Sequence, residues 1–111
     1  MKIPFLASVS ATVAAGRAVG RLSPGVAGSR WTIERMVTST TLGPTVPANL
    51  VVYKNVESPT TRLDGTSSAG QDTSETNIDI DSSDSLVAVW TGVANGTVCT
   101  LTVSGINDTG R

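Results

Sequence analysis

Two runs rich in valine and threonine, joined through an Asn-Gly pair, constrain the fold of this chain more than any other feature. Residues 86–91 read Leu-Val-Ala-Val-Trp-Thr, and residues 98–103 read Val-Cys-Thr-Leu-Thr-Val. Such residues favour strands, and Asn95 followed by Gly96 tolerates the positive φ angles of a tight hairpin turn. The sequence therefore predicts a β-hairpin. Alternation along its strands directs these side chains into one core: Leu86, Trp90, Cys99, Leu101 and Val103.

The segment around Trp31 predicts another strand. Trp31, Ile33 and Val37 share one parity, which is the period of a half-buried strand. The alternation breaks at Arg35 and Met36. This break predicts either a bulge or burial on both faces of the strand.

The whole chain is long enough, at 111 residues, to bury one core without a metal or a disulfide. Residues 50–55 and 77–81 add further short strands, and no segment predicts a helix. About seven or eight short strands separated by turn residues are typical of two packed sheets. We therefore predict an all-β fold, an antiparallel two-sheet β-sandwich of jelly-roll or Greek-key type, formed by residues 1–111 as a single domain.

The ends and two loops complete the predicted organisation. Residues 1–16 form an N-terminal arm or an edge strand, and not a secretory signal, because Pro4 and several polar residues interrupt their apolar run. Residues 106–111 form a loose tail. The prolines of residues 42–49 predict a loop, and the polar residues 58–76 predict the longest loop, where binding contacts are common.

Charged residues are divided unevenly along the chain, although the net charge is only −1. Most basic residues fall in residues 1–62, and residues 63–110 hold acidic residues and no base. If the halves occupy different faces, the domain is an electric dipole suited to contacts between copies or with an acidic surface. If the halves intermix, their charges pair locally. The sequence leaves both arrangements open.

The sequence contains none of the residue combinations that form common active sites. The chain has no histidine, which excludes the Ser-His-Asp and Cys-His nucleophile systems and the usual zinc sites. Asp108-Thr109-Gly110 matches the tripeptide of aspartic proteases, but it lacks the buried strands that follow it in those enzymes. The lone Cys99 suits a small buried side chain. We predict no enzyme activity and no cofactor.

Acidic residues gather in residues 72–84, where they either bind calcium or form a solvated strand edge. Asp79 and Asp81 alternate with isoleucines, as solvent-facing strand residues do, and their spacing departs from that of an EF-hand. An acidic edge also opposes pairing between strands of different copies. The edge interpretation is favoured, and no metal is predicted.

Neither a nucleic acid nor a membrane is a predicted partner. The basic residues are spread singly, no nucleic-acid-binding signature accompanies them, and the isoelectric point is ≈ 5.1. No apolar run approaches the length that crosses a bilayer.

Six short segments carry a resemblance to a known class of protein. They are residues 30–35 (Arg-Trp-Thr-Ile-Glu-Arg), 52–55 (Val-Tyr-Lys-Asn), 57–59 (Glu-Ser-Pro), 63–66 (Leu-Asp-Gly-Thr), 70–74 (Gly-Gln-Asp-Thr-Ser) and 86–92 (Leu-Val-Ala-Val-Trp-Thr-Gly). In this order and spacing they resemble small virion proteins of tailed bacteriophages, particularly those that infect actinobacteria. The resemblance covers most of residues 30–105.

The resemblance implies a β-sandwich module with a structural role in the virion. The leading hypothesis is a capsid decoration protein on the outer shell. It would bind the major capsid protein and copies of itself, as a homo-oligomer, and would stabilise the shell by bridging subunits. The alternative is a tail or fibre module that binds host glycan or other tail proteins, and exposed aromatic rings would favour it. The residues expected to contact partners are Lys2, Phe5, Arg17, Arg21, Pro44, Pro47, Pro59, Asp64 and Asp72.

Overall fold

The computed structural model describes residues 1–42 and 48–109, and every regular element in this part of the chain is a β-strand. The predicted all-β class is therefore confirmed. The strands are β1 (Lys2–Thr12), β2 (Arg17–Leu22), β3 (Arg30–Thr40), β4 (Asn49–Lys54), β5 (Arg62–Thr66), β6 (Gln71–Asp81), β7 (Leu86–Thr91) and β8 (Val98–Asp108).

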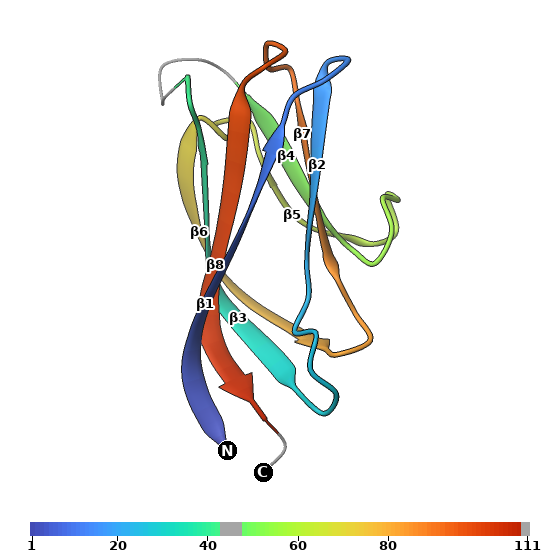
Figure 1. Ribbon diagram of the computed structural model, residues 1–111, viewed down its shortest axis with the longest axis vertical. Helices are drawn as coiled ribbons and strands as arrows, with labels where there is room; N and C mark the ends of the chain where they lie inside the picture. Colours follow the sequence, from blue (N-terminus) through green and yellow to red (C-terminus); the bar gives the residue numbers. More distant parts are fainter. Residues whose placement is uncertain (43–47, 110–111) are drawn as a thin grey trace.

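These strands form two antiparallel sheets of four strands each (Figure 1). The long sheet has the order β1-β8-β3-β6, and the short sheet has the order β2-β7-β4-β5. The pairing is nested: β1 pairs with β8, β2 with β7, β3 with β6 and β4 with β5. A nested set of pairs folded into two layers is the topology of a jelly roll, so the predicted β-sandwich is confirmed.

The core lies between the two sheets and is built from the inward-facing side chains of both. Trp90 of β7 is fully buried, and it donates its indole N–H to the hydroxyl oxygen of Thr38 on β3 at 3.0 Å. Phe5 of β1 stacks on Trp31 of β3 with ring centroids 4.5 Å apart. The side chains that the sequence assigned to one core all lie in it: Leu86, Trp90, Cys99, Leu101 and Val103.

The predicted hairpin is nevertheless wrong, because β7 and β8 belong to different sheets. Residues 92–97 carry the chain across from the short sheet to the long one. Gly96 has a positive φ angle but Asn95 does not, so the pair does not form the type I′ turn of a two-residue hairpin. The Asn95 side chain instead accepts a hydrogen bond from the backbone N–H of Gly16 at 2.9 Å, which ties the crossing to the turn between β1 and β2.

The loop predicted at residues 58–76 is also wrong over much of its length, since it contains β5 and the first half of β6. Along residues 62–76 these strands lack a continuous apolar stripe. Their inward positions hold half-buried polar residues, such as Asp64 and Ser74, in place of core aliphatic side chains. Threonine still favours the extended backbone there.

Both ends of the described chain lie in the long sheet. Residues 2–12 form β1 at its edge, and β8 pairs with β1 and with β3 as far as Asp108. Residues 106–108 are therefore strand and not the predicted loose tail. The backbone N–H of Thr109 continues this pairing by donating to the carbonyl oxygen of Met1 at 2.9 Å.

A β-bulge interrupts β3 at Glu34, where the register with both neighbouring strands shifts between Ile33 and Arg35. This confirms the bulge that the broken alternation predicted as one of two explanations. The extra residue reverses the parity of the strand. Met36 is therefore buried and Val37 is not, so the inward position expected for Val37 is wrong.

Gly105 of β8 lies against this bulge. A Cβ atom at Gly105 would lie 2.0 Å from the carbonyl oxygen of Thr32 and 2.9 Å from the backbone nitrogen of Glu34. Both are main-chain atoms of a paired strand and cannot move aside cheaply. Only glycine therefore fits at this position of β8.

Candidate functional site

The residues proposed from the sequence for partner contacts do not form one site. Pro44 and Pro47 lie outside the described residues. Of the others, Asp64 and Asp72 line one cavity together, whereas the basic residues and Phe5 are spread over β1 and β2. Phe5 points inward and is half-buried against Trp31, so its ring contributes to packing.

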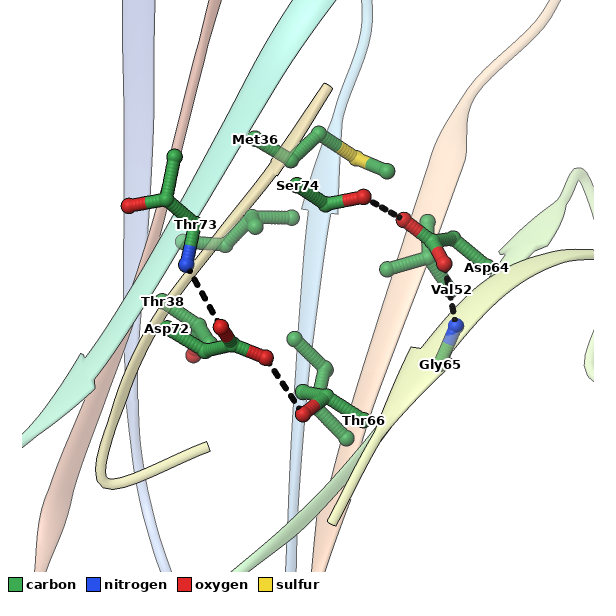
Figure 2. Close-up of a pocket in the computed structure, with 11 residues that line it drawn as sticks. Met36, Thr38, Val52, Asp64, Gly65, Thr66, Asp72, Thr73 and Ser74 are labelled. Atoms are coloured by element: carbon green, nitrogen blue, oxygen red, sulfur yellow. Dashed lines mark hydrogen bonds between the residues drawn. The ribbon is translucent and has the colours of Figure 1, made fainter. Parts of the chain in front are cut away.

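Asp64 and Asp72 face a cleft between β5 and β6, which are the neighbouring edges of the two sheets (Figure 2). Ser74 of β6 donates its hydroxyl hydrogen to Asp64 Oδ2 at 2.6 Å, and Thr66 of β5 donates to Asp72 Oδ2 at 2.6 Å. The Oδ1 atom of each aspartate accepts the backbone N–H of the following residue, at 2.8 and 2.9 Å. Each carboxylate thus connects its own strand to the opposite sheet.

The cleft is small and its polar groups already have partners. It encloses about 120 Å³, whereas small-molecule sites enclose about 300–1,000 Å³. Every carboxylate oxygen in it accepts a hydrogen bond. The arrangement is a polar closure between two sheet edges over an apolar floor, and it has no room for a sugar. The floor consists of Met36, Leu50, Val52 and Leu101.

Arg17 and Arg21 of β2 both contact other residues of the same chain. Arg17 forms an ion pair with Glu57, and the Arg21 guanidinium donates to the carbonyl oxygen of Asn55 at 3.3 Å. Both contacts reach the connection between β4 and β5, which also carries the exposed Pro59. The two arginines therefore hold this connection against β2.

The broadest regular surface is the outer face of the long sheet, and the sequence reasoning missed it. Part of this face, which we call the hydroxyl face, is uncharged and made mostly of serine and threonine. Ser10 and Thr100 hydrogen-bond across it at 2.9 Å. Serine or threonine alternating with apolar residues in β1, β3 and β8 was the signal for it. The hydroxyl face consists of Ser8, Ser10, Val37, Ser39, Gln71, Thr73, Thr100 and Thr102.

The rest of the same outer face mixes charged residues with uncharged ones such as Pro4, Leu6 and Ile106, and its charges alternate in sign across the strands. Arg35 of β3 forms an ion pair with Glu75 of β6 at 2.9 Å. An open hollow of about 480 Å³ lies beside this pair. Its outer-face lining is Pro4, Arg35, Glu75, Ser104 and Ile106. The row at the far end of the sheet is Lys2, Asp108, Arg30 and Asp81.

The two halves of the chain intermix in the sheets, which decides between the two predicted arrangements of charge. Besides the Arg35–Glu75 pair, Lys54 lies 3.6 Å from Asp84, and the N-terminal amine lies 3.7 Å from Asp108. In each pair the base comes from the first half and the acid from the second. The charges therefore pair locally, and the separation along the sequence does not produce two oppositely charged faces.

The acidic residues 72–84 do not gather around a common point. The described part of the chain contains no group of three or more acidic or cysteine side chains that could hold a metal ion. The side-chain and backbone hydrogen bonds from Ser83 lower the pKa of Asp81. The side-chain hydrogen bond from Asn55 lowers the pKa of Asp84 in the same way. Asp81 and Asp84 are neighbours, since the backbone N–H of Asp81 donates to Asp84 Oδ2 at 3.2 Å, but no third carboxylate of the described residues joins them.

The two tryptophans and the cysteine lie in the interior. Trp90 is fully buried and Trp31 is only 7 % exposed, so neither indole offers a flat platform to a sugar. Cys99 is also fully buried, as the sequence predicted, and burial raises the pKa of its thiol. A protonated, enclosed thiol is chemically inert.

No family model and no curated protein sequence matches the chain. The described residues include no helix of the length and apolar character that a membrane span requires. The six segments that resemble virion proteins lie on β3 to β7 and the connections next to them.

Proposed function

We propose that this protein is a non-enzymatic structural component of a bacteriophage virion, and that it decorates the capsid. It binds the major capsid protein and neighbouring copies of itself on the outer shell, and it stabilises the shell by bridging subunits. The resemblance of the six segments supports the virion. Jelly rolls occur in viral capsid proteins and also in lectins, so the fold by itself does not choose between these roles.

The outer face of the long sheet carries the proposal. Its four strands have 11 residues each. With strands about 4.8 Å apart and a rise of about 3.4 Å per residue, the face measures roughly 19 by 37 Å, or about 700 Å². Each partner in a standard protein interface contributes about 800 Å². The face is therefore large enough for one specific protein contact.

The chemistry of this face also suits a protein partner. The hydroxyl face carries no charge, so covering it avoids the large cost of removing ions from water. The charged rows beside it fix orientation by pairing with complementary charges, which gives specificity more than affinity. The short sheet is less suitable because its strands have 5 or 6 residues and its β2 edge is tied to the β4–β5 connection.

The proposal is tested by immunogold labelling of intact phage particles that carry this chain. We expect label over the whole capsid surface, in many copies per particle. Label confined to the tail would overturn the decoration role and would favour the tail or fibre module. A glycan array with the purified chain then separates glycan binding from binding to other tail proteins.

A matched pair of variants connects shell binding to the proposed face. Ser39→Arg places a large charge in the hydroxyl face, whereas Thr91→Arg places the same charge at an exposed position of β7 in the short sheet. Purified variants are added to particles that lack the protein, and the bound copies are counted after sedimentation. We expect Ser39→Arg to reduce bound copies by tenfold or more and Thr91→Arg to leave them unchanged. Equal binding would overturn the assignment of this face.

A further inference from the structure

The edge strand β1 presents a row of backbone groups that no strand in the described part of the chain pairs with. Val13 donates its N–H to Thr97 on the β8 side at 2.8 Å, and Met1 accepts from Thr109 on the same side. The register between β1 and β8 runs from Lys2 to Thr12 without a shift. Odd-numbered residues therefore bond to β8, and even-numbered residues point their N–H and C=O groups toward the free edge.

Pro4 agrees with this assignment. It is an even-numbered residue, so the N–H that proline lacks would have faced outward, which is where prolines are tolerated in sheets. The N–H groups of Leu6, Ser8 and Ser10 remain on the free edge. In Figure 1 the N-terminal half of β1 lies on the outside of the molecule, apart from β2.

The other three edges are protected against pairing over their length, whereas β1 has such features only near its start, at Lys2 and Pro4. Strand β6 carries four acidic residues, and β5 is short with a register shift beside it. Strand β2 is short and carries Arg17 and Arg21. By contrast, β1 has 11 residues and its one charge is Lys2 at the very start. Charges, prolines, bulges and short length are the usual means by which proteins prevent edge association, and β1 has none of them from Phe5 to Thr12.

Leu6 lies near the start of this unprotected stretch. It is 73 % exposed, more than any other large hydrophobic residue in the described chain, and its side chain lies on the outer face of the long sheet. Ile3 on the same strand is 40 % exposed. A second strand beside β1 would pair its free backbone groups and would also cover the Leu6 side chain.

We infer that β1 pairs with β1 of a second copy of this chain, antiparallel and about a two-fold axis through Leu6. This register places Leu6 beside Leu6 of the second copy and Lys2 beside its Ser10. The two leucines cover each other, and no like charges meet, because Lys2 faces an uncharged residue. The two long sheets join into one continuous sheet of both copies.

The size of this contact predicts its strength. Nine residues at about 3.4 Å each give an edge of roughly 31 Å, and a sheet edge about 10 Å thick gives roughly 300 Å² per copy. The total of about 600 Å² is half the lower limit of a standard interface. The free chain is therefore expected to dimerise weakly, and chemical trapping is the appropriate measurement.

Disulfide trapping in the full chain tests the register. Paired residues on adjacent antiparallel strands have Cα atoms about 5.5 Å apart, within the range of a disulfide. We expect Leu6→Cys to form covalent dimers with oxidised glutathione at least tenfold faster than Ser10→Cys. In the proposed register the two Ser10 positions lie about 27 Å apart. The unmodified chain is the background control, since its Cys99 is buried.

Two further measurements complete the test. Chains with Lys2→Cys mixed with chains with Ser10→Cys should cross-link to each other faster than either does to itself. Adding Ser8→Pro to Leu6→Cys should reduce cross-linking tenfold or more, because it removes an outward N–H and no bond to β8. Equal rates for Leu6→Cys and Ser10→Cys, or no cross-link, would overturn the inference, even where Ser8→Pro fails to fold.

This inference adds the site of contact between copies to the proposed function. Its test uses the purified chain without particles. A failure to cross-link would leave shell binding untouched, and label confined to the tail would leave the β1 contact untouched.

Discussion

Thr38 on β3 accepts the indole N–H of Trp90 on β7 at 3.0 Å, and this buried hydrogen bond joins the two sheets through the centre of the core. We expect Thr38→Val to reduce the free energy of unfolding by about 1–3 kcal/mol. Valine has nearly the same shape as threonine, so the loss comes from leaving the indole N–H unpaired and from removing the longer bond that the Thr38 hydroxyl donates to the Ala69 carbonyl oxygen at 3.4 Å. Chemical denaturation followed by tryptophan fluorescence measures it.

Thr40 provides a matched control on the same strand. Its hydroxyl oxygen is buried but has no hydrogen-bond partner among the described residues. Thr40→Val should therefore be neutral or stabilising by up to about 1 kcal/mol, because it removes a polar atom that is buried without compensation. Equal destabilisation by both substitutions would show that the Trp90 hydrogen bond contributes nothing specific.

Gly105 should not tolerate alanine. The added Cβ would lie 2.0 Å from the Thr32 carbonyl oxygen, so Gly105→Ala must displace the bulged strand. We expect a loss of about 3 kcal/mol or more in the free energy of unfolding. Gly96→Ala is the control, since no atom lies within 4 Å of its Cβ position and only its positive φ angle is strained. It should cost about 1–2 kcal/mol. A ranking in the opposite order would contradict the bulge geometry.

Asp84 should make stability depend on pH in the acid range. Its hydrogen bond from the Asn55 side chain lowers the pKa below the usual 3.8. The carboxylate therefore contributes stability that is fully present above the unfolded-state pKa and is lost as pH falls through the lower folded-state pKa. Asp84→Asn should destabilise the protein at pH 7 and have little effect near pH 2. Urea midpoints at the two pH values measure this. An equal loss at both values would assign the effect to packing.

The cleft between β5 and β6 should act as a closure between the sheets. A double-mutant cycle with Asp64→Ala and Ser74→Ala should give a coupling energy of about 1–2 kcal/mol, because a hydrogen bond to a charged group is lost only once. The control cycle pairs Asp64→Ala with Ser10→Ala, whose hydroxyl bonds Thr100 on the opposite side of the long sheet. That pair should be additive. Additivity in both cycles would show that the cleft does not couple the sheets.

Local patterns predicted most of the strands and the composition of the core. The alternation around Trp31 located β3 and its bulge, and the residues assigned to the core all lie in it. These predictions succeed because alternation depends on neighbouring residues only. The parity of Val37 was wrong because a bulge reverses alternation, and a break in the pattern does not say on which side the extra residue falls.

The pairing of strands was not predictable from local patterns. Residues 86–103 contain two good strands around an Asn-Gly pair, yet these strands belong to opposite sheets. The two-residue turn is favoured only when the strands it joins can pair with each other. Here β7 pairs with β2 and β4, and β8 pairs with β1 and β3. Long-range partners therefore decided the path of the chain.

The candidate site was predictable only in part. Asp64 and Asp72 were selected as members of a polar loop, and the structure brings them together because β5 and β6 are strands at adjacent sheet edges. The hydroxyl face requires four strands side by side, which no single segment reveals. Surfaces that several strands assemble depend on strand order and register, and neither can be derived from one strand alone.

The nested pairing of the jelly roll also determines how the chain must fold during synthesis. Among the strands of the described residues, only β4 and β5 are consecutive and pair with each other, so every other pair waits for a later part of the chain. Of these eight strands, β1 leaves the ribosome before the others and its partner β8 leaves after them. Distant pairing of this kind slows folding, and it leaves β1 with both edges open while the rest is made. A nascent chain is therefore most vulnerable to association with its neighbours through β1.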